Sequence, residues 1–369
     1  MKQKIIFTIN SIQKNGPNTV LENMVKGLKD DNFDIYIISF LSSDDKGELE
    51  KFNKYPISHI CLSYENKKEI IQKGTHDLQE IVSRLNPNII HSHGLFPDYV
   101  SSRLTTSAIR ITTIHNLPFE DYVNRFGAIA GILMAKWHMS ILKKFDQIIC
   151  CSETSYKHLK KHTNKEVTFI RNAINIKEKW EVKKEKVRDL MRENLGISSS
   201  DIVYIFAGNL SKGKNIKFLV DNFTRNHLAN EKLVILGLGK ELEYCEQNND
   251  GSILLLGFQK NVKDYYFMSD IYISASKSEG FSISILEALE CGLYIFLSNI
   301  PAHLEVLNVD KRSFIGSSFS EGSFSKDLIK FRKKYLKLNN KDDVITFKNE
   351  HFTAKLMMEQ YKKYYTEMH

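Results

Sequence analysis

Short apolar runs of the kind that form β-strands alternate with helical segments along nearly the whole chain of 369 residues. Segments with helical spacing, such as 19–28 and 76–85, lie between these runs. Such alternation predicts parallel sheets covered by helices on both faces, because parallel strands need helical crossovers. The predicted strands are 5–9, 35–40, 57–62, 89–91, 111–114, 147–151, 167–170, 203–207, 233–236, 253–256, 271–274 and 294–297.

The chain is too long for one ordinary core, and a stretch rich in lysine and glutamate at 177–193 interrupts the alternation as a linker or surface helix. We therefore expect an α/β protein with two Rossmann-like doubly wound domains facing across a cleft, at 1–175 and 176–345. Ligands of such folds bind at the carboxyl ends of the strands. A C-terminal helix at 346–369 should return to the N-terminal domain through one apolar face: Phe352, Leu356, Met357, Tyr361, Tyr364 and Tyr365.

The composition is that of a soluble globular protein, with 26% charged and 42% hydrophobic residues. The net charge of +8 favours anionic partners. The basic residues are spread among acids and are not striped with aromatics, so a nucleic-acid partner is not expected. The five cysteines include no Cys-x-x-Cys pair, and the chain enters its first predicted strand almost at once. Both features indicate reduced thiols, no signal peptide and a cytoplasmic location.

The longest strongly apolar run, at 126–135, is shorter than the roughly 20 residues that span a bilayer. Lys136, Trp137 and His138 follow it directly. One interpretation is a helix lying in the interface of an anionic membrane, which would place the protein peripherally on the inner face of the cell membrane. The other is a buried helix with a basic end, because the run also contains small residues that suit close packing.

The segment 275–292 carries two carboxylates, Glu279 and Glu287, where a loop meets a predicted helix. Ser284 and Glu287 have capping-box spacing, which predicts a helix from near Ser284 to near Gly292. Free N–H groups at such a helix start attract phosphate, and carboxylates accept hydrogen bonds from hydroxyls. A nucleotide sugar offers both groups, so it suits this segment.

A second loop, at 206–215, follows a predicted strand and carries Gly208, Lys212 and Lys214. Backbone N–H groups and two cations in such a turn can bind a diphosphate, although the spacing is not that of a Walker A loop. The segment 236–239 resembles half of a dinucleotide fingerprint but lacks its third glycine.

The first half adds a loop containing Gly16, where Thr19 and Glu22 form another capping-box pattern. His93, His115 and Asn116 lie at or just after the ends of two predicted strands, where ligands bind. Histidines so placed also suit a metal, but no acidic residue accompanies them at ligand spacing, so we expect none.

The order of these motifs along the chain resembles that in the retaining nucleotide-sugar glycosyltransferases with two Rossmann domains (GT-B). The resemblance is greatest to family 4 of these enzymes, also called glycosyl transferases group 1. Many of its members act in cell-envelope and capsule synthesis. The resemblance is closest over 204–305. It implies that Glu279 faces hydroxyls of the donor sugar, Glu287 holds the ribose, Lys214 neutralises the diphosphate and His115 lies near the reacting sugar.

The same resemblance assigns the nucleotide sugar to the C-terminal domain and the acceptor to the N-terminal domain. The family's usual arginine is replaced by Asn209, and Lys212 is our candidate for the missing charge. The acceptor side comprises His93 and Asn116. The donor-binding positions are Gly16, Asn209, Lys212, Lys214, Gly257, Phe258, Gln259, Gly280, Phe281, Ser282, Ile283, Ser284 and Glu287.

The implied reaction is transfer of a sugar, with retained anomeric configuration, from a nucleoside diphosphate sugar to a glycan or lipid-linked glycan acceptor. UDP is the favoured nucleotide, and cell-envelope polysaccharide synthesis is the implied setting. No cofactor or metal is expected, since no two aspartates of the chain are separated by one residue, as a metal-binding Asp-x-Asp would require. Two alternatives stay open: a nucleotide-sugar epimerase or phosphorylase on the same scaffold, and a non-enzymatic protein that binds polyanions or membranes.

Overall fold

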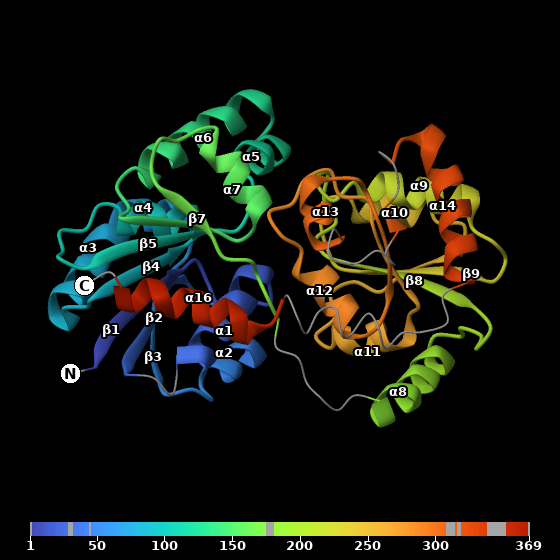
Figure 1. The fold of residues 1–369 in the computed structure, drawn as a ribbon, viewed down its shortest axis with the longest axis horizontal. Helices are drawn as coiled ribbons and strands as arrows, with labels where there is room; N and C mark the ends of the chain where they lie inside the picture. Colours follow the sequence, from blue (N-terminus) through green and yellow to red (C-terminus); the bar gives the residue numbers. More distant parts are fainter. Residues whose placement is uncertain are drawn as a thin grey trace. The chain divides into compact units, whose positions relative to one another are not determined.

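The computed structural model describes residues 2–28, 32–43, 46–174, 181–307, 314–315, 319–337 and 352–367 (Figure 1). The chain divides into two compact units. Unit 1 comprises residues 1–175 and 352–369, and unit 2 comprises residues 176–351. The predicted domain boundaries at 175/176 and 345/346 lie outside the described residues.

Unit 1 is built on a parallel sheet with strand order β3-β2-β1-β4-β5-β6-β7. The strands are β1 (Gln3–Ile9), β2 (Phe33–Leu41), β3 (Ile57–Tyr64), β4 (Ile89–His93), β5 (Ile109–Ile114), β6 (Gln147–Cys150) and β7 (Val167–Phe169). The helices are α1 (Gly16–Leu28), α2 (Lys46–Phe52), α3 (Lys67–Leu85), α4 (Leu95–Ser101), α5 (Pro118–Phe126), α6 (Ala128–Leu142), α7 (Glu153–Lys160) and α16 (Ala354–Glu367).

Unit 2 repeats this plan with strand order β10-β9-β8-β11-β12-β13. Its strands are β8 (Ile202–Ala207), β9 (Glu231–Leu236), β10 (Ile253–Leu255), β11 (Ile271–Ser274), β12 (Tyr294–Leu297) and β13 (Phe314–Ile315). Its helices are α8 (Glu181–Asn194), α9 (Ile216–Asn226), α10 (Leu242–Gln247), α11 (Val262–Met268), α12 (Ile283–Glu290), α13 (Pro301–Leu307) and α14 (Glu321–Tyr335). The prediction of two Rossmann-like α/β units is confirmed, and among the strands of the described residues only β13 was not anticipated.

The central strands explain why the sequence reads as continuous apolar runs. Strands β4, β6, β11 and β12 are buried at every residue. A strand covered on both faces needs apolar side chains on both faces. Its sequence therefore lacks the alternation of apolar and polar residues that is typical of half-exposed strands. In each unit the order reverses beside the first strand, between β1 and β4 and between β8 and β11. Ligands of doubly wound folds bind at this switch point.

The C-terminal helix α16 belongs to unit 1, where it lies beside α1 (Figure 1). Tyr361 and Tyr365 are fully buried, and the Tyr365 hydroxyl lies 2.7 Å from Nδ1 of His91 on β4. Close approach to α1 requires Gly27, where a Cβ would lie 2.3 Å from Cγ of Met358. The predicted apolar face is confirmed except at Leu356, which is 39% exposed.

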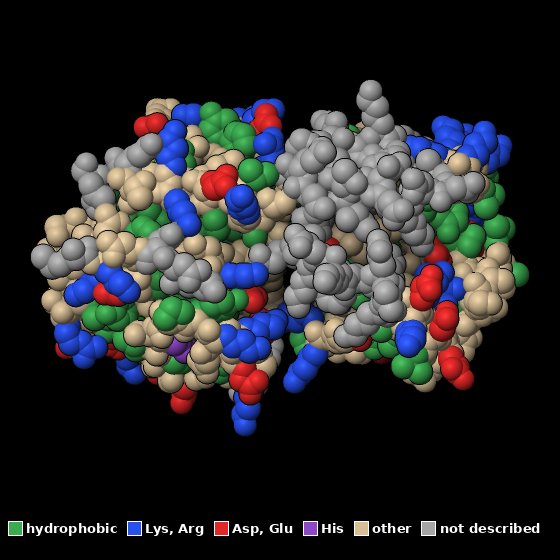
Figure 2. Space-filling view, turned by 60° about the horizontal axis from the view of Figure 1, so that its bottom comes forward, with side chains coloured by type: hydrophobic (Ala, Val, Ile, Leu, Met, Phe, Trp, Pro, Cys, Tyr) green, Lys and Arg blue, Asp and Glu red, His purple; other side chains and the backbone are tan. Residues whose placement is uncertain are grey.

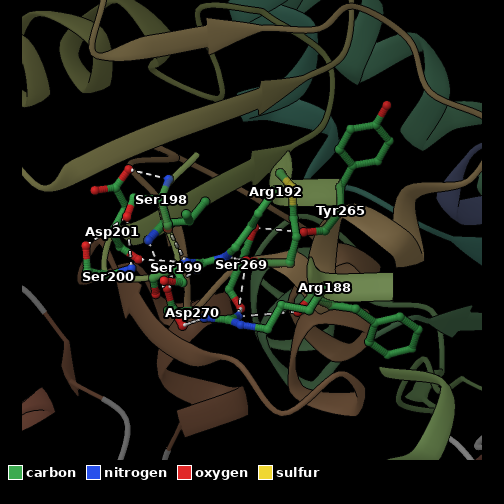
Figure 3. Close-up of polar contacts among 12 residues, drawn as sticks. Arg188, Arg192, Ser198, Ser199, Ser200, Asp201, Tyr265, Ser269 and Asp270 are labelled. Carbon is green, nitrogen blue, oxygen red and sulfur yellow. Dashed lines mark hydrogen bonds and ion pairs between the residues drawn. The ribbon is translucent and has the colours of Figure 1, made fainter. Parts of the chain in front are cut away.

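Helix α8 accounts for the charged stretch that interrupts the strand–helix alternation. Arg188 and Arg192 bind the two carboxylate oxygens of Asp270 at 2.8 and 2.9 Å (Figure 3). Arg192 also donates to the backbone carbonyls of Met268 and Asp201, each at 2.9 Å. The described part of the stretch, residues 181–193, is therefore a helix fixed to unit 2.

The predicted helix from near Ser284 to near Gly292 is confirmed, but neither predicted capping-box residue stands at the N-cap. Helix α12 begins at Ile283 with Ser282 at the N-cap, and ends at Glu290. Helix α1 begins at Gly16, three residues before Thr19, whose hydroxyl donates to the Asn15 carbonyl at 3.1 Å. Serine and threonine also occur inside a first turn, where they bond back to the preceding turn, so this spacing does not define the N-cap.

Candidate functional site

The loops after β8, β9 and β10 extend the sheet of unit 2 beyond its strands. Gly208 N donates to Leu236 O at 3.0 Å, and Gly237 N donates to Gly257 O at 2.8 Å. Gly237 has φ +142°, and a Cβ there would lie 1.9 Å from the Gly208 carbonyl oxygen. The glycines of 236–239 thus allow these loops to pack backbone to backbone, which explains the partial resemblance to a dinucleotide fingerprint.

Glu279 and Lys214 meet at the carboxyl end of this sheet. Lys214 Nζ lies 2.9 Å from Glu279 Oε1, and the Glu279 side chain is only 5% exposed. Lys277 N donates to Gly213 O at 2.9 Å and joins the two loops that carry the pair. Burial alone would raise the pKa of Glu279, but Lys214, His303 and Ser276 hold it well below its usual range. The site therefore holds an ionised carboxylate beside a partly exposed ammonium.

The start of α12 adjoins this pair. Gly280, Phe281, Ser282 and Ile283 are buried, while Ser284 and Glu287 are half-buried on the first turns. Ser282 makes no side-chain capping bond. The first N–H groups of the helix thus carry its positive end without a side-chain cap, as an anion site requires.

The remaining predicted positions of unit 2 are more open. Asn209 and Lys212 are exposed, and Phe258 is 48% exposed. Gly257 adopts φ +64°, and Gln259 Nε2 donates to Leu256 O at 2.6 Å, so both shape the loop after β10. These five residues lie in loops that follow β8 and β10, at the same end of the sheet as Glu279.

Unit 1 contains a pocket of about 400 Å³ at its own switch point, lined by both polar and apolar residues. The predicted His93, His115 and Asn116 line it, whereas Gly16 does not, although its neighbours Asn15 and Pro17 do. The other polar lining residues carry hydroxyl, amide or imidazole groups, apart from one lysine: Asn10, Ser11, Gln13, Asn18, Lys67, Thr113, Tyr122 and His138.

Three stacked histidines run from β4 to the end of β5, and two of them, His93 and His115, line this pocket. Ring centroids of His91 and His93 are 4.6 Å apart, and those of His93 and His115 are 5.2 Å apart. Burial lowers the pKa of His91 to about 3 and that of His115 to about 4. Burial, together with the two neighbouring rings, holds the pKa of His93 well below its ordinary value. All three are therefore neutral at neutral pH.

The tautomers of the last two rings are linked. His93 Nδ1 lies 2.9 Å from His115 Nε2, so one nitrogen donates and the other accepts. The two remaining nitrogens, His93 Nε2 and His115 Nδ1, are buried without a partner among the described residues. One of these must then be a donor and the other an acceptor, which suits hydroxyl groups better than phosphate.

Sequence reasoning missed a second buried network at this pocket. Asp98, which is fully buried on α4, accepts from His138 Nε2 at 2.8 Å and from Thr112 Oγ1 at 2.7 Å. His138 Nδ1 lies 2.9 Å from the Tyr122 hydroxyl, so the chain of contacts ends at the pocket wall. Burial first, then Asp98 and Asp121, raises the pKa of Tyr122 well above its ordinary value, so this hydroxyl stays protonated.

Comparison with protein families decides the class. Glycosyl transferases group 1 matches residues 187–344, and Glycosyltransferase Family 4 matches residues 14–178. The chain is a GT-B glycosyltransferase of these families.

This glycosyltransferase is similar to known relatives over about three quarters of its length or more. It is 26% identical to the O-antigen biosynthesis glycosyltransferase WclY of Escherichia coli, across 99% of this chain and 98% of the relative. It is 24% identical to the UDP-Gal:alpha-D-GlcNAc-diphosphoundecaprenol alpha-1,3-galactosyltransferase of Escherichia coli, across 74% of this chain and 73% of the relative. Its fold matches HepE of Anabaena, solved with UDP-glucose, with a TM-score of 0.79, 15% identity and coverage of 99% and 100%.

The described part of this glycosyltransferase contains neither a cluster of metal-ligating side chains nor a helix that could cross a membrane. No group of three or more His, Cys, Asp or Glu side chains among the described residues could hold a metal ion. None of the described helices is both long enough and apolar enough to cross a membrane. On the face shown in Figure 2, basic and acidic side chains are interspersed with apolar and neutral ones.

Proposed function

We propose that this glycosyltransferase is a retaining enzyme that transfers a sugar from a nucleoside diphosphate sugar, with UDP favoured, to a glycan or lipid-linked glycan acceptor. The setting is cell-envelope polysaccharide synthesis, in the cytoplasm. Relatives named for O-antigen biosynthesis and for a UDP-Gal donor with a diphosphoundecaprenol acceptor support this proposal. The likeness to a protein solved with UDP-glucose supports the choice of donor.

The observation that carries the proposal is the pair formed by Glu279 and Lys214 beside the start of α12. In this proposal unit 2 holds the donor. Glu279 accepts hydrogen bonds from sugar hydroxyls, Glu287 binds the ribose, and the loop containing Gly257 contacts the nucleobase. Lys214 and the N–H groups at the start of α12 bind the diphosphate, with Lys212 replacing the charge absent at Asn209.

In this proposal unit 1 holds the acceptor in the pocket at its switch point. Its neutral amides, hydroxyls and imidazoles suit a sugar, because each can donate to or accept from a hydroxyl without an uncompensated charge. His115 lies near the reacting sugar in this assignment, and His93 and Asn116 contact the acceptor. The linked tautomers of His93 and His115 offer one donor and one acceptor to adjacent hydroxyls.

The reaction breaks the bond between the anomeric carbon and the diphosphate and forms a bond from that carbon to the acceptor oxygen. Negative charge develops on the leaving diphosphate, where Lys214 and the α12 terminus stabilise it. The acceptor proton passes to the leaving phosphate, so no side chain need act as a base. Neither a cofactor nor a metal is needed in this scheme, since the protein supplies the positive charge.

We also propose peripheral contact between helices α5 and α6 and an anionic membrane. Phe126, Ile129 and Leu133 are 53%, 80% and 63% exposed on this hairpin. The hairpin is tight, because a Cβ on Gly131 would lie 2.5 Å from the backbone of Val123. Exposed lysines of α6 and its C-terminal end, at 136, 143 and 144, can meet lipid phosphates while the apolar side chains insert.

Replacement of Glu279 by glutamine tests the proposed function. Glu279→Gln keeps the shape of the side chain but removes its charge, so we expect transfer from the preferred nucleotide sugar to fall by roughly 100-fold or more. Glu290→Gln is the matched control, since Glu290 is also buried on α12 and lies 2.8 Å from a lysine, Lys263. A panel of nucleotide sugars first identifies the donor by thermal stabilisation of the wild type. Full turnover in Glu279→Gln would refute the assignment.

A further inference from the structure

His303 has no role in the reaction described above, yet its side chain lies against the carboxylate of Glu279. The side chain, on α13, is fully buried. Its Nδ1 lies 2.9 Å from the carbonyl oxygen of Ser298 and 3.2 Å from the hydroxyl of the same residue. That hydroxyl donates its proton to Ser276 O at 2.6 Å, so toward His303 it can only accept. Both neighbours of Nδ1 are acceptors, and Nδ1 must carry a proton.

The other ring nitrogen also faces an acceptor. Nε2 lies 3.5 Å from Oε1 of Glu279 and makes no hydrogen bond among the described residues. An unprotonated Nε2 would direct a lone pair at an ionised carboxylate where both side chains are buried, so the repulsion between them would be strong. The geometry therefore favours a proton on both nitrogens, so that His303 is an imidazolium beside Glu279.

Glu279 then has two cationic neighbours that differ in mobility. Lys214 Nζ and His303 Nε2 approach the same oxygen, Oε1, at 2.9 and 3.5 Å. The Lys214 side chain is 30% exposed and long, whereas the His303 ring is completely enclosed. One carboxylate with two cations has a net charge of +1, which favours an incoming anion.

We propose that His303 is the permanent counter-ion of Glu279 and that Lys214 is an exchangeable one. When a diphosphate binds, the Lys214 ammonium moves to its oxygens, and His303 keeps Glu279 ionised and oriented toward the sugar. This inference rests on the proposed function, in which the ligand is a nucleoside diphosphate sugar. His303 is a positioning residue, since it acts through Glu279.

The need for a second cation follows from the burial of Glu279. A buried carboxylate that loses its only cation is strongly destabilised. Without His303, Lys214 could leave Glu279 only at that cost, so the lysine would remain paired and the diphosphate would bind without it. We expect UDP to bind His303→Gln roughly tenfold or more weakly than the wild type.

The first measurement is the protonation state of the ring. Nitrogen NMR of the full chain with isotope-labelled histidine should show His303 as an imidazolium, both free and with UDP bound. The His303→Gln variant assigns the signal. In Lys214→Met the ring should stay charged, whereas in Glu279→Gln it should become neutral. A neutral His303 in the wild type would overturn the proposal, and this test does not require any donor to be known.

The second measurement is the affinity for UDP by calorimetry. His227→Gln is the control, because His227 also pairs with a carboxylate, Asp250 at 3.0 Å, but lies at the opposite end of α9 from Lys214. We expect His227→Gln to bind UDP like the wild type and His303→Gln to bind it weakly. Equal affinity in His303→Gln would overturn the exchange. If the wild type binds neither UDP, ADP nor GDP, the proposed function fails, and the exchange fails with it.

Discussion

At the scale of single residues, the two candidate sites differ in the charge of their buried side chains. Unit 2 keeps a buried carboxylate ionised by placing cations beside it, as at Glu279. Unit 1 keeps its buried histidines neutral, because His91, His93 and His115 lie together away from solvent. The first arrangement suits an anionic ligand, and the second suits an uncharged one.

The neutral histidines predict a loss of stability in acid. The pKa of His91 is about 3 in the folded protein, against about 6.5 in the unfolded chain, so the unfolded chain binds protons first as the pH falls. Stability should be full above pH ~6.5 and should be lost toward lower pH, with His91 alone costing roughly 2 kcal/mol at pH 5. Thermal unfolding between pH 7.5 and pH 5 measures this loss.

A pair of variants isolates the contribution of His91. His91→Gln should flatten the dependence on pH, whatever its stability at pH 7.5. His76→Gln should keep the wild-type dependence, since the His76 side chain is 75% exposed. An unchanged slope in His91→Gln would contradict the prediction.

Residue roles were predictable only where a local motif marks them. Glu279, Lys214 and His115 stand in segments whose order resembles a known family, and the structure places the first two in contact. His303 lies in an ordinary helix, and its importance comes from a carbonyl and a carboxylate brought near by folding. The network formed by Asp98, His138 and Tyr122 spans three helices, so no spacing of residues in the sequence predicts it.

At the scale of secondary structure, strands were easier to predict than helix ends. Strands buried on both faces are marked by apolar runs, and the structure has a strand at each predicted run. Helix starts depend on which of several nearby polar side chains caps the backbone, and Ser284 and Thr19 were wrongly chosen. Strand β13 is too short to give a pattern.

The loops of unit 2 provide an element-scale prediction. Gly237→Ala should destabilise unit 2 by about 2–4 kcal/mol and abolish nucleotide binding, because the new Cβ would overlap the Gly208 carbonyl and the φ of +142° is unsuited to alanine. Gly322→Ala is the control, since no atom lies within 4 Å of its added Cβ. Thermal unfolding and titration with UDP measure both effects, and a Gly237→Ala protein that matched Gly322→Ala would show that the loops do not need this close contact.

At the scale of the whole molecule, the exposed hairpin formed by α5 and α6 predicts where the enzyme meets a membrane. Ile129→Ser combined with Leu133→Ser should weaken binding to phosphatidylglycerol vesicles at least tenfold, since each buried aliphatic side chain contributes roughly 2 kcal/mol. Transfer to a short soluble acceptor should not change. Flotation of the protein with vesicles measures the binding.

A single substitution on unit 2 provides the control for this prediction. Leu336→Ser removes an aliphatic side chain that is 72% exposed, comparable to those of the hairpin. It should leave flotation unchanged. Undiminished flotation of the double variant would assign membrane contact to another surface or to none.

The position of α16 has a consequence for synthesis on the ribosome. Unit 1 receives Tyr361 and Tyr365 into its interior, although most of its chain is made before any of unit 2. The nascent first half therefore cannot complete its interior, and the surface around His91 stays uncovered, until α16 has been made. Unit 2 can finish folding before unit 1, and a protein truncated before α16 would lack part of the interior of its first domain.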